Sequence, residues 1–249
     1  MQVVINKLLI NYQSVGNGPV VIIVHGWGDD LLSFVKLQES LSKSYRVISL
    51  DLPGFGKSTG PDSGWSLDDF SEFIRDFTDK LKLSVYAYIG HSNGGGILIK
   101  GLADKTITAD KLVLIASAGV RGTQQFRKTA LKVGVKIGKI PLKILPTTYQ
   151  LELKKRLYKA IKSDAQVNPQ MLETFKKIVK QDVTRDASKL SLPSLIIYGR
   201  DDKVTPPEYG QIFNELIKGS NLELIAGCGH FVHLQQPEKV EALIEDFLK

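Results

Sequence analysis

The chain has 249 residues, of which 43% are hydrophobic and 24% charged, values typical of one soluble domain or one domain with an insertion. Its longest apolar runs, at 20–24 and 112–120, are too short to span a bilayer, so no transmembrane segment is expected. The single cysteine, Cys228, allows no internal disulfide, and Asn6 and Lys7 interrupt the N-terminal apolar run, which argues against a signal peptide. A cytoplasmic protein is therefore predicted.

The net charge of +7 is concentrated in one segment. Residues 121–185 contain 16 Lys and Arg but only 4 Asp and Glu, a balance of +12, whereas the rest of the chain carries −5. The simplest interpretation is a helical segment with solvated lysines. The alternative is that this segment attracts anionic substrates or contacts an anionic membrane surface. Nucleic-acid binding is not expected, because the sequence has no recognition motif for it.

Strand and helix patterns alternate along the first part of the chain. The β-branched run at 20–24 is typical of a strand buried on both faces of a parallel sheet. Ser66 to Asp69 has the form of a capping box at the start of a helix. The predicted elements are, in order, one or two edge strands at 3–15, a strand at 20–24, a helix at 31–42, a strand at 45–50, a helix from Ser66, a strand at 85–89, a helix at 95–102 and a strand at 111–117.

The alternation stops between residues 119 and 188, a mostly helical stretch far longer than an ordinary loop, and we interpret it as an inserted helical cap. It then resumes with a strand at 194–198, a helix from Pro207 to about Lys218, a strand at 222–225 and a helix from Pro237. Alternating strands and helices predict an α/β fold with a mostly parallel, doubly wound sheet. The predicted core is 1–118 and 189–249, and the predicted cap is 119–188.

A G-x-S-x-G pattern spans Gly90 to Gly94, between a predicted strand and a predicted helix. A sharp strand-to-helix turn places its central residue, Ser92, in a strained conformation and lifts the side chain clear of the sheet. Glycine is required on both sides because a Cβ at Gly90 or Gly94 would collide with neighbouring backbone. The following helix directs its free N–H groups at whatever Ser92 attacks. This context predicts a nucleophilic serine, although a plain glycine-rich turn would show the same pattern.

A nucleophilic serine needs a base within hydrogen-bond reach, and that base needs a carboxylate to orient it. Asp201 and Asp202 directly follow the predicted strand at 194–198, and His230 and His233 follow the one at 222–225. All of them would emerge at the same carboxyl edge of the sheet as Ser92. The sequence thus offers a Ser–Asp–His order with two candidates for the acid and two for the base.

Five motifs occur together in a fixed order: HGWGD at His25, DLPGFGKS at Asp51, GHSNGG at Gly90, GRDDKVTP at Gly199 and GCGHFVHLQQP at Gly227. In this combination the chain resembles the α/β-hydrolase family over essentially its whole length. The resemblance implies an α/β-hydrolase fold with Ser92, Asp202 and His230 as the catalytic triad.

The resemblance also implies an oxyanion hole formed by the backbone N–H groups of Trp27 and Asn93. Many relatives carry Glu where this chain has Gln235 or Gln236 before Pro237, and we expect no direct catalytic consequence. His25 and His91 are interpreted as structural. No metal or organic cofactor is predicted, because no carboxylate or thiolate spacing turns His230-x-x-His233 into a zinc motif.

Relatives that open epoxides or remove halogens carry aspartate at the position of Ser92, so the serine points to an acyl-enzyme instead. The prediction is a serine hydrolase, carboxylesterase-like, acting on small to medium, largely apolar small-molecule esters. A C–C bond hydrolase or a cofactor-free haloperoxidase-like enzyme would use the same triad. A slow-turnover ligand receptor on the same fold is the alternative of another class. The oligomeric state is left open.

Overall fold

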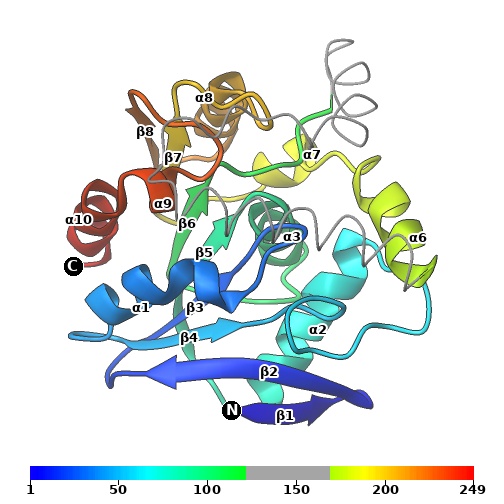
Figure 1. The fold of residues 1–249 in the computed structure, drawn as a ribbon. Coiled ribbons are helices and arrows are strands. Elements are labelled where there is room, and N and C mark those ends of the chain that lie inside the picture. The colour runs from blue at the N-terminus through cyan, green and yellow to red at the C-terminus, as the bar shows by residue number, and fades with distance from the viewer. Residues whose placement is uncertain (122–168) are drawn as a thin grey trace, which may run out of the picture.

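The computed structural model describes residues 1–121 and 169–249, and eight strands in these residues form one sheet (Figure 1). The strand order is β1-β2-β4-β3-β5-β6-β7-β8. Strands β3 to β8 run parallel, whereas β2 pairs antiparallel with β4 and with β1 at the edge. The strands are β1 Gln2–Ile5, β2 Leu8–Val15, β3 Val20–Val24, β4 Arg46–Leu50, β5 Val85–His91, β6 Lys111–Ile115, β7 Ser194–Gly199 and β8 Ser220–Ile225. The predicted α/β fold with a mostly parallel sheet is confirmed.

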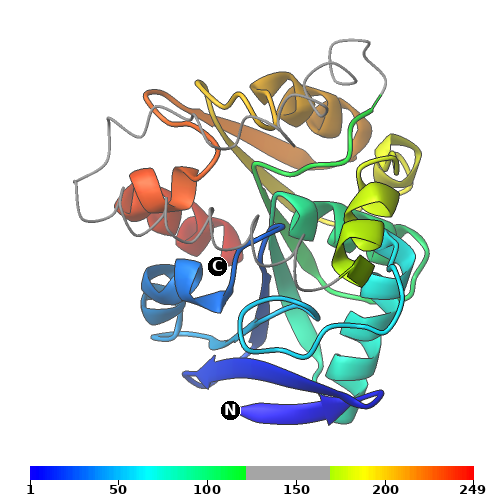
Figure 2. The same cartoon turned by 45° about the vertical axis from the view of Figure 1, so that its right-hand side comes forward.

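Helices cover both faces of the sheet (Figures 1 and 2). Alternate residues of β3 face opposite cores, with Ile22 packed among α2, α3 and α8 and Ile23 packed among α1 and α10. This explains why the strand is apolar throughout, since neither face meets water. The helices are η1 Leu31–Phe34 (3₁₀), α1 Val35–Leu41, α2 Leu67–Lys80, α3 Asn93–Ala103, α6 Pro169–Ile178, α7 Thr184–Ala187, α8 Pro207–Leu216, α9 Val232–Gln235 and α10 Pro237–Leu248.

The start of α2 follows the predicted capping box. The Asp69 N–H donates to Ser66 Oγ at 3.3 Å, and the Ser66 N–H donates to Asp69 Oδ2 at 2.7 Å. Two backbone donors at the helix end are thereby satisfied. The capping box fixes where α2 begins and therefore the path of the loop before it, which reaches the carboxyl edge of the sheet.

Helix α3 begins at Asn93, two residues earlier than predicted, because the Ser92 carbonyl already accepts hydrogen bonds from the N–H groups of Gly95 and Gly96 at 3.1 and 3.4 Å. Strand β5 runs two residues beyond the prediction, since His91 still pairs with Ile115 of β6. Strand and helix are thus separated by Ser92 alone. Gly94, predicted to end the turn, is the second residue of the helix.

The predicted cap, 119–188, and the basic segment, 121–185, fall largely on residues 122–168, which lie outside the described residues. Of the rest, α6 packs on the loop that precedes α2: the Trp65 N–H donates to Thr174 Oγ1 at 2.8 Å and Lys177 Nζ donates to the Gly64 carbonyl at 2.7 Å. None of the helices within 1–121 and 169–249 has the length and apolar character needed to cross a membrane.

Candidate functional site

Three side chains meet at the carboxyl edge of the sheet. Ser92 follows β5, Asp202 follows β7 and His230 follows β8, so the parallel strands deliver all three to one edge. Ser92 Oγ lies 3.0 Å from His230 Nε2, and His230 Nδ1 lies 2.9 Å from Asp202 Oδ2. This is the connected nucleophile, base and carboxylate arrangement that acyl transfer by a serine requires.

The backbone at Ser92 is strained, with φ 52° and ψ −117°. Such a conformation is rare for a residue with a Cβ and is held by its surroundings. A Cβ on Gly90 would lie 2.7 Å from the backbone nitrogen of Gly95, and a Cβ on Gly94 would collide with the Val24 carbonyl oxygen. The two glycines therefore let the strand and helix approach closely enough to present Ser92 at the tip of the turn.

Asp202 is fully engaged as an acceptor. Its Oδ1 accepts from the N–H groups of Val204 at 2.8 Å and Thr205 at 3.0 Å, and its Oδ2 accepts from His230 Nδ1. Because a carboxylate only accepts, His230 carries its proton on Nδ1 and presents the Nε2 lone pair to Ser92. Asp202 is buried whereas Asp201 is exposed. The geometry therefore singles out Asp202 and His230 from the candidates that the sequence offered.

Thr205 is a part of this network that sequence reasoning missed. Its Oγ1 lies 2.9 Å from Asp202 Oδ2, 3.0 Å from His230 Nδ1 and 2.9 Å from the carbonyl oxygen of Ala116 at the end of β6. Thr205 is buried, so this hydroxyl has no competing water. Its only signal in the sequence is its place three residues after Asp202.

We expect Thr205→Val to lower kcat about tenfold and to reduce the free energy of unfolding by about 1–2 kcal/mol, because the one buried hydroxyl proton that the Ala116 carbonyl and Asp202 share is lost. Thr205→Ser keeps the hydroxyl and should restore most of kcat. The measurements are ester hydrolysis kinetics and urea unfolding of both variants. A Thr205→Val enzyme with unchanged kcat but reduced stability would show that Thr205 only supports the fold.

Of the two backbone donors predicted for the oxyanion hole, Asn93 is the first residue of α3, so its N–H has no acceptor within the helix. Trp27 lies in the loop after β3 beside Gly26, where an added Cβ would lie 3.0 Å from Ser92 Cβ. The Trp27 ring packs on Phe55 at 4.9 Å and on Phe175 of α6 at 5.2 Å between centroids. The role of both N–H groups stays a prediction.

His25 is buried and anchors the loop before Trp27, as expected for a structural residue. Its Nε2 accepts from the Leu52 N–H at 2.9 Å, and its Nδ1 donates to the Gly26 carbonyl at 2.7 Å. Gln235 accepts the Gly229 N–H at 2.7 Å through Oε1 and so holds the loop that leads into His230. An amide oxygen accepts this bond as a carboxylate would, which gives Gln235 a clear structural role.

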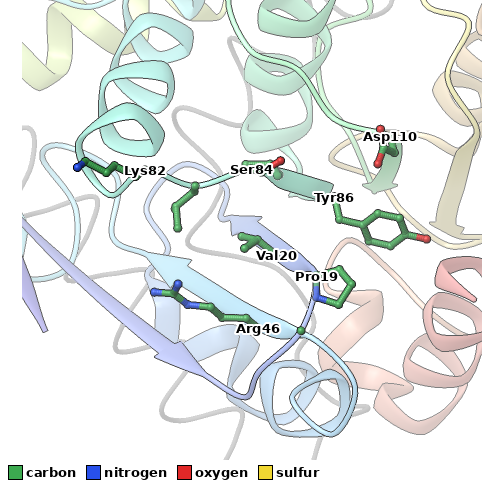
Figure 3. Close-up of a pocket in the computed structure, with 10 residues that line it drawn as sticks. Pro19, Val20, Arg46, Lys82, Ser84, Tyr86 and Asp110 are labelled. Carbon is green, nitrogen blue, oxygen red and sulfur yellow. The ribbon is translucent and has the colours of Figure 1, made fainter.

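A polar hollow opens at the opposite edge of the sheet, where β3 and β5 begin (Figure 3). It is lined by Pro19, Arg46, Lys82 and Asp110, among others. The seven residues of β5 separate it from Ser92 by about 20 Å at the usual rise per residue. It therefore takes no part in the arrangement around Ser92.

The model of the alpha/beta hydrolase fold matches residues 19–237, which is most of the chain. The chain belongs to the α/β-hydrolase family. Its mostly parallel, eight-stranded sheet is that of an α/β-hydrolase, as the motifs implied.

Relatives of this α/β-hydrolase act on different bonds. It is 27% identical over 255 residues to 2-hydroxy-6-oxo-6-(2'-aminophenyl)hexa-2,4-dienoic acid hydrolase of Metapseudomonas resinovorans, covering 91% of this chain and 83% of the relative. It is 26% identical over 246 residues to pimeloyl-[acyl-carrier protein] methyl ester esterase of Nitrosomonas europaea, covering 92% and 96%. The crystal structure of a bromoperoxidase from Bacillus anthracis superposes with a TM-score of 0.83 at 23% identity, covering 97% and 95%, which shows the shared fold.

Proposed function

We propose that this α/β-hydrolase cleaves small to medium, largely apolar carboxylic esters through an acyl-enzyme intermediate. The observation that carries the proposal is the continuous contact from Ser92 Oγ to His230 Nε2 and from His230 Nδ1 to Asp202 Oδ2, at 3.0 and 2.9 Å. Catalysis then needs no group beyond the side chains and backbone of this chain.

In the proposed mechanism Ser92 Oγ attacks the ester carbonyl carbon while its proton passes to His230 Nε2. The carbonyl oxygen becomes an oxyanion that accepts hydrogen bonds from the N–H groups of Trp27 and Asn93. The imidazolium returns its proton to the leaving alcohol as the C–O bond breaks, which leaves an ester between Ser92 and the acyl group. Water, deprotonated by His230, then attacks this ester, His230 returns the proton to Ser92 Oγ as the bond to the acyl group breaks, and the acid leaves. Asp202 holds the imidazole in position and stabilises its positive charge throughout.

The proposed preference for apolar substrates is supported by the aromatic character of one predicted oxyanion donor. The Trp27 ring packs on Phe55 and Phe175. Aromatic side chains near a site favour an apolar acyl or alcohol group over a charged one. The esterase among the relatives is consistent with the choice of an ester bond.

A C–C bond hydrolase is the second candidate, favoured by the 27% identity to the hexadienoic acid hydrolase. Such a reaction uses the same side chains but requires a pocket for a ring and for an acidic chain end. We therefore expect this candidate only if simple esters are rejected. A 2-hydroxy-6-oxo-dienoic acid with an aryl substituent would serve as its test substrate.

The deciding experiment is hydrolysis of a p-nitrophenyl ester series, from acetyl to palmitoyl, by the full chain. We expect rapid multiple turnover with an optimum at a short or medium acyl length. Labelling of Ser92 by a fluorophosphonate without turnover of any ester would contradict the esterase proposal and favour the C–C hydrolase. A single turnover followed by tight retention of the ligand would instead favour a receptor.

A further inference from the structure

A second group of polar side chains lies beneath the triad and takes no part in the proposed reaction. It consists of Asp29 in the loop after β3, His91 at the end of β5 and His233 in α9, here called the buried cluster. One carboxylate oxygen and one ring nitrogen from each histidine lie within 4.8 Å of one another. His91 and His233 are 1% and 6% exposed, and Asp29 is half-buried with its Oδ2 atom shielded from solvent.

The free atoms of the buried cluster have no partner among the described residues. These atoms are Asp29 Oδ2, His91 Nδ1 and both ring nitrogens of His233. Buried polar atoms without partners are rare, because each one loses its hydrogen bonds to water without replacement. The other two histidines of the chain, His25 and His230, have both ring nitrogens engaged.

The positions of the protons leave hydrogen-bond acceptors facing one another in the buried cluster. His91 Nε2 donates to the His230 carbonyl at 3.1 Å, so in the neutral ring Nδ1 carries a lone pair. Asp29 Oδ1 accepts from Ser33 Oγ, and Oδ2 remains as a second acceptor. Two acceptors cannot bond each other, so a proton, a water or a cation has to stand between them.

We propose that Asp29, His91 and His233 form a binding site for a divalent transition-metal ion, with Zn²⁺ as the best match. Two imidazoles and one carboxylate are ligands that Zn²⁺ prefers. Three atoms no more than 4.8 Å apart fit inside a circle of radius 4.8/√3, about 2.8 Å. Since bonds to Zn²⁺ are about 2.0–2.2 Å long, each ligand atom has to move inward by about 0.8 Å at most.

The protonation states agree with this assignment. Burial holds the pKa of His91 well below its usual value and lowers the pKa of His233 to about 3, so both rings are neutral and can act as ligands. Burial also raises the pKa of the Asp29 carboxyl, while the hydrogen bond from Ser33 lowers it. A bound cation would lower this pKa further.

The sequence predicted no metal site, and the only candidate pair weighed there was His230 and His233. In the structure these two histidines are separated in role, since His230 contacts Ser92 and His233 belongs to the buried cluster. An ion there would tie together the three loops that carry Trp27, Ser92 and His230. The bound ion would therefore stabilise the segments that carry the proposed catalytic groups. The metal-site proposal does not depend on whether the substrate is an ester.

The test uses the full chain, stripped with EDTA and then given Zn²⁺ or Co²⁺ at a small excess. We expect one equivalent of metal to be retained after gel filtration, visible d–d absorption with Co²⁺, and a rise in Tm of about 5–10 °C. Asp29→Asn, which preserves the shape of the side chain, and His233→Phe, which keeps the stacking on Phe34 at 4.5 Å, should each abolish retention and the Tm rise. Cys228→Ser, which removes a buried thiol outside the cluster, should behave as wild type.

Two results would overturn the proposal. If wild type retains no metal and its Tm does not change, a water or a shared proton fills the cluster instead. If Asp29→Asn and His233→Phe both fold, as judged by circular dichroism, and still retain one equivalent, the ion is bound elsewhere. Neither result bears on the ester hydrolysis assay, so the two proposals can fail separately.

Discussion

Ser92→Ala is expected to lower kcat by about 10⁵- to 10⁶-fold, because it removes the oxygen atom that attacks the substrate in the proposed mechanism. The activity that remains would come from binding and from the oxyanion donors. The fold should be unaffected: alanine keeps the Cβ, so the strain at φ 52° is the same as in wild type. Hydrolysis of the best p-nitrophenyl ester and the Tm from circular dichroism measure the two effects.

Ser194→Ala is the matched control for Ser92→Ala. Ser194 is buried, whereas Ser92 is half-buried, and Ser194 Oγ donates to the Leu192 carbonyl at 2.9 Å at the start of β7, the edge of the sheet opposite Ser92. It should retain wild-type kcat and full fluorophosphonate labelling, whereas Ser92→Ala should show neither. An active and labelled Ser92→Ala enzyme would refute the assignment of the nucleophile.

Asp202→Asn is expected to lower kcat by about 10⁴-fold with a small change in KM. The backbone N–H groups of Val204 and Thr205, which donate to Asp202 Oδ1 in the wild type, would hold the amide oxygen of the asparagine at that position. The amide NH₂ would then face His230 Nδ1, so that nitrogen would have to accept rather than donate. The ring would carry its proton on Nε2 and could not take the proton of Ser92. Steady-state kinetics on the same ester series measures the loss.

The neighbouring Asp201→Asn provides the comparison, since Asp201 is exposed and one residue away. It should leave kcat within about twofold of wild type, as is usual for an exposed position away from the site. A large loss in Asp201→Asn together with an active Asp202→Asn would reverse the assignment of the acid. Equal and small losses in both would mean that His230 needs no carboxylate here.

Much of the core could be predicted because its signals are local. The apolar strand at 20–24, the capping box at Ser66 and the prolines at 207 and 237 depend on neighbours a few residues away. The elbow could be recognised for the same reason, since Gly90 and Gly94 are required by the close approach of β5 and α3. The start of α3 is predicted two residues too late, because the pattern from Gly90 to Gly94 indicates a turn throughout, whereas the helix already begins at Asn93.

The sequence by itself determined the order of strands and helices, the nucleophile turn and the short set of acids and bases that could serve it. Only the tertiary structure decided which of them meet: Asp202 rather than Asp201 lies against His230, and Thr205 joins them. It also brought His233 to Asp29 and His91, from positions at least 62 residues apart in the chain. The physical reason is that local patterns specify backbone direction, whereas contacts between distant loops depend on how the parallel strands bring their carboxyl ends to one edge.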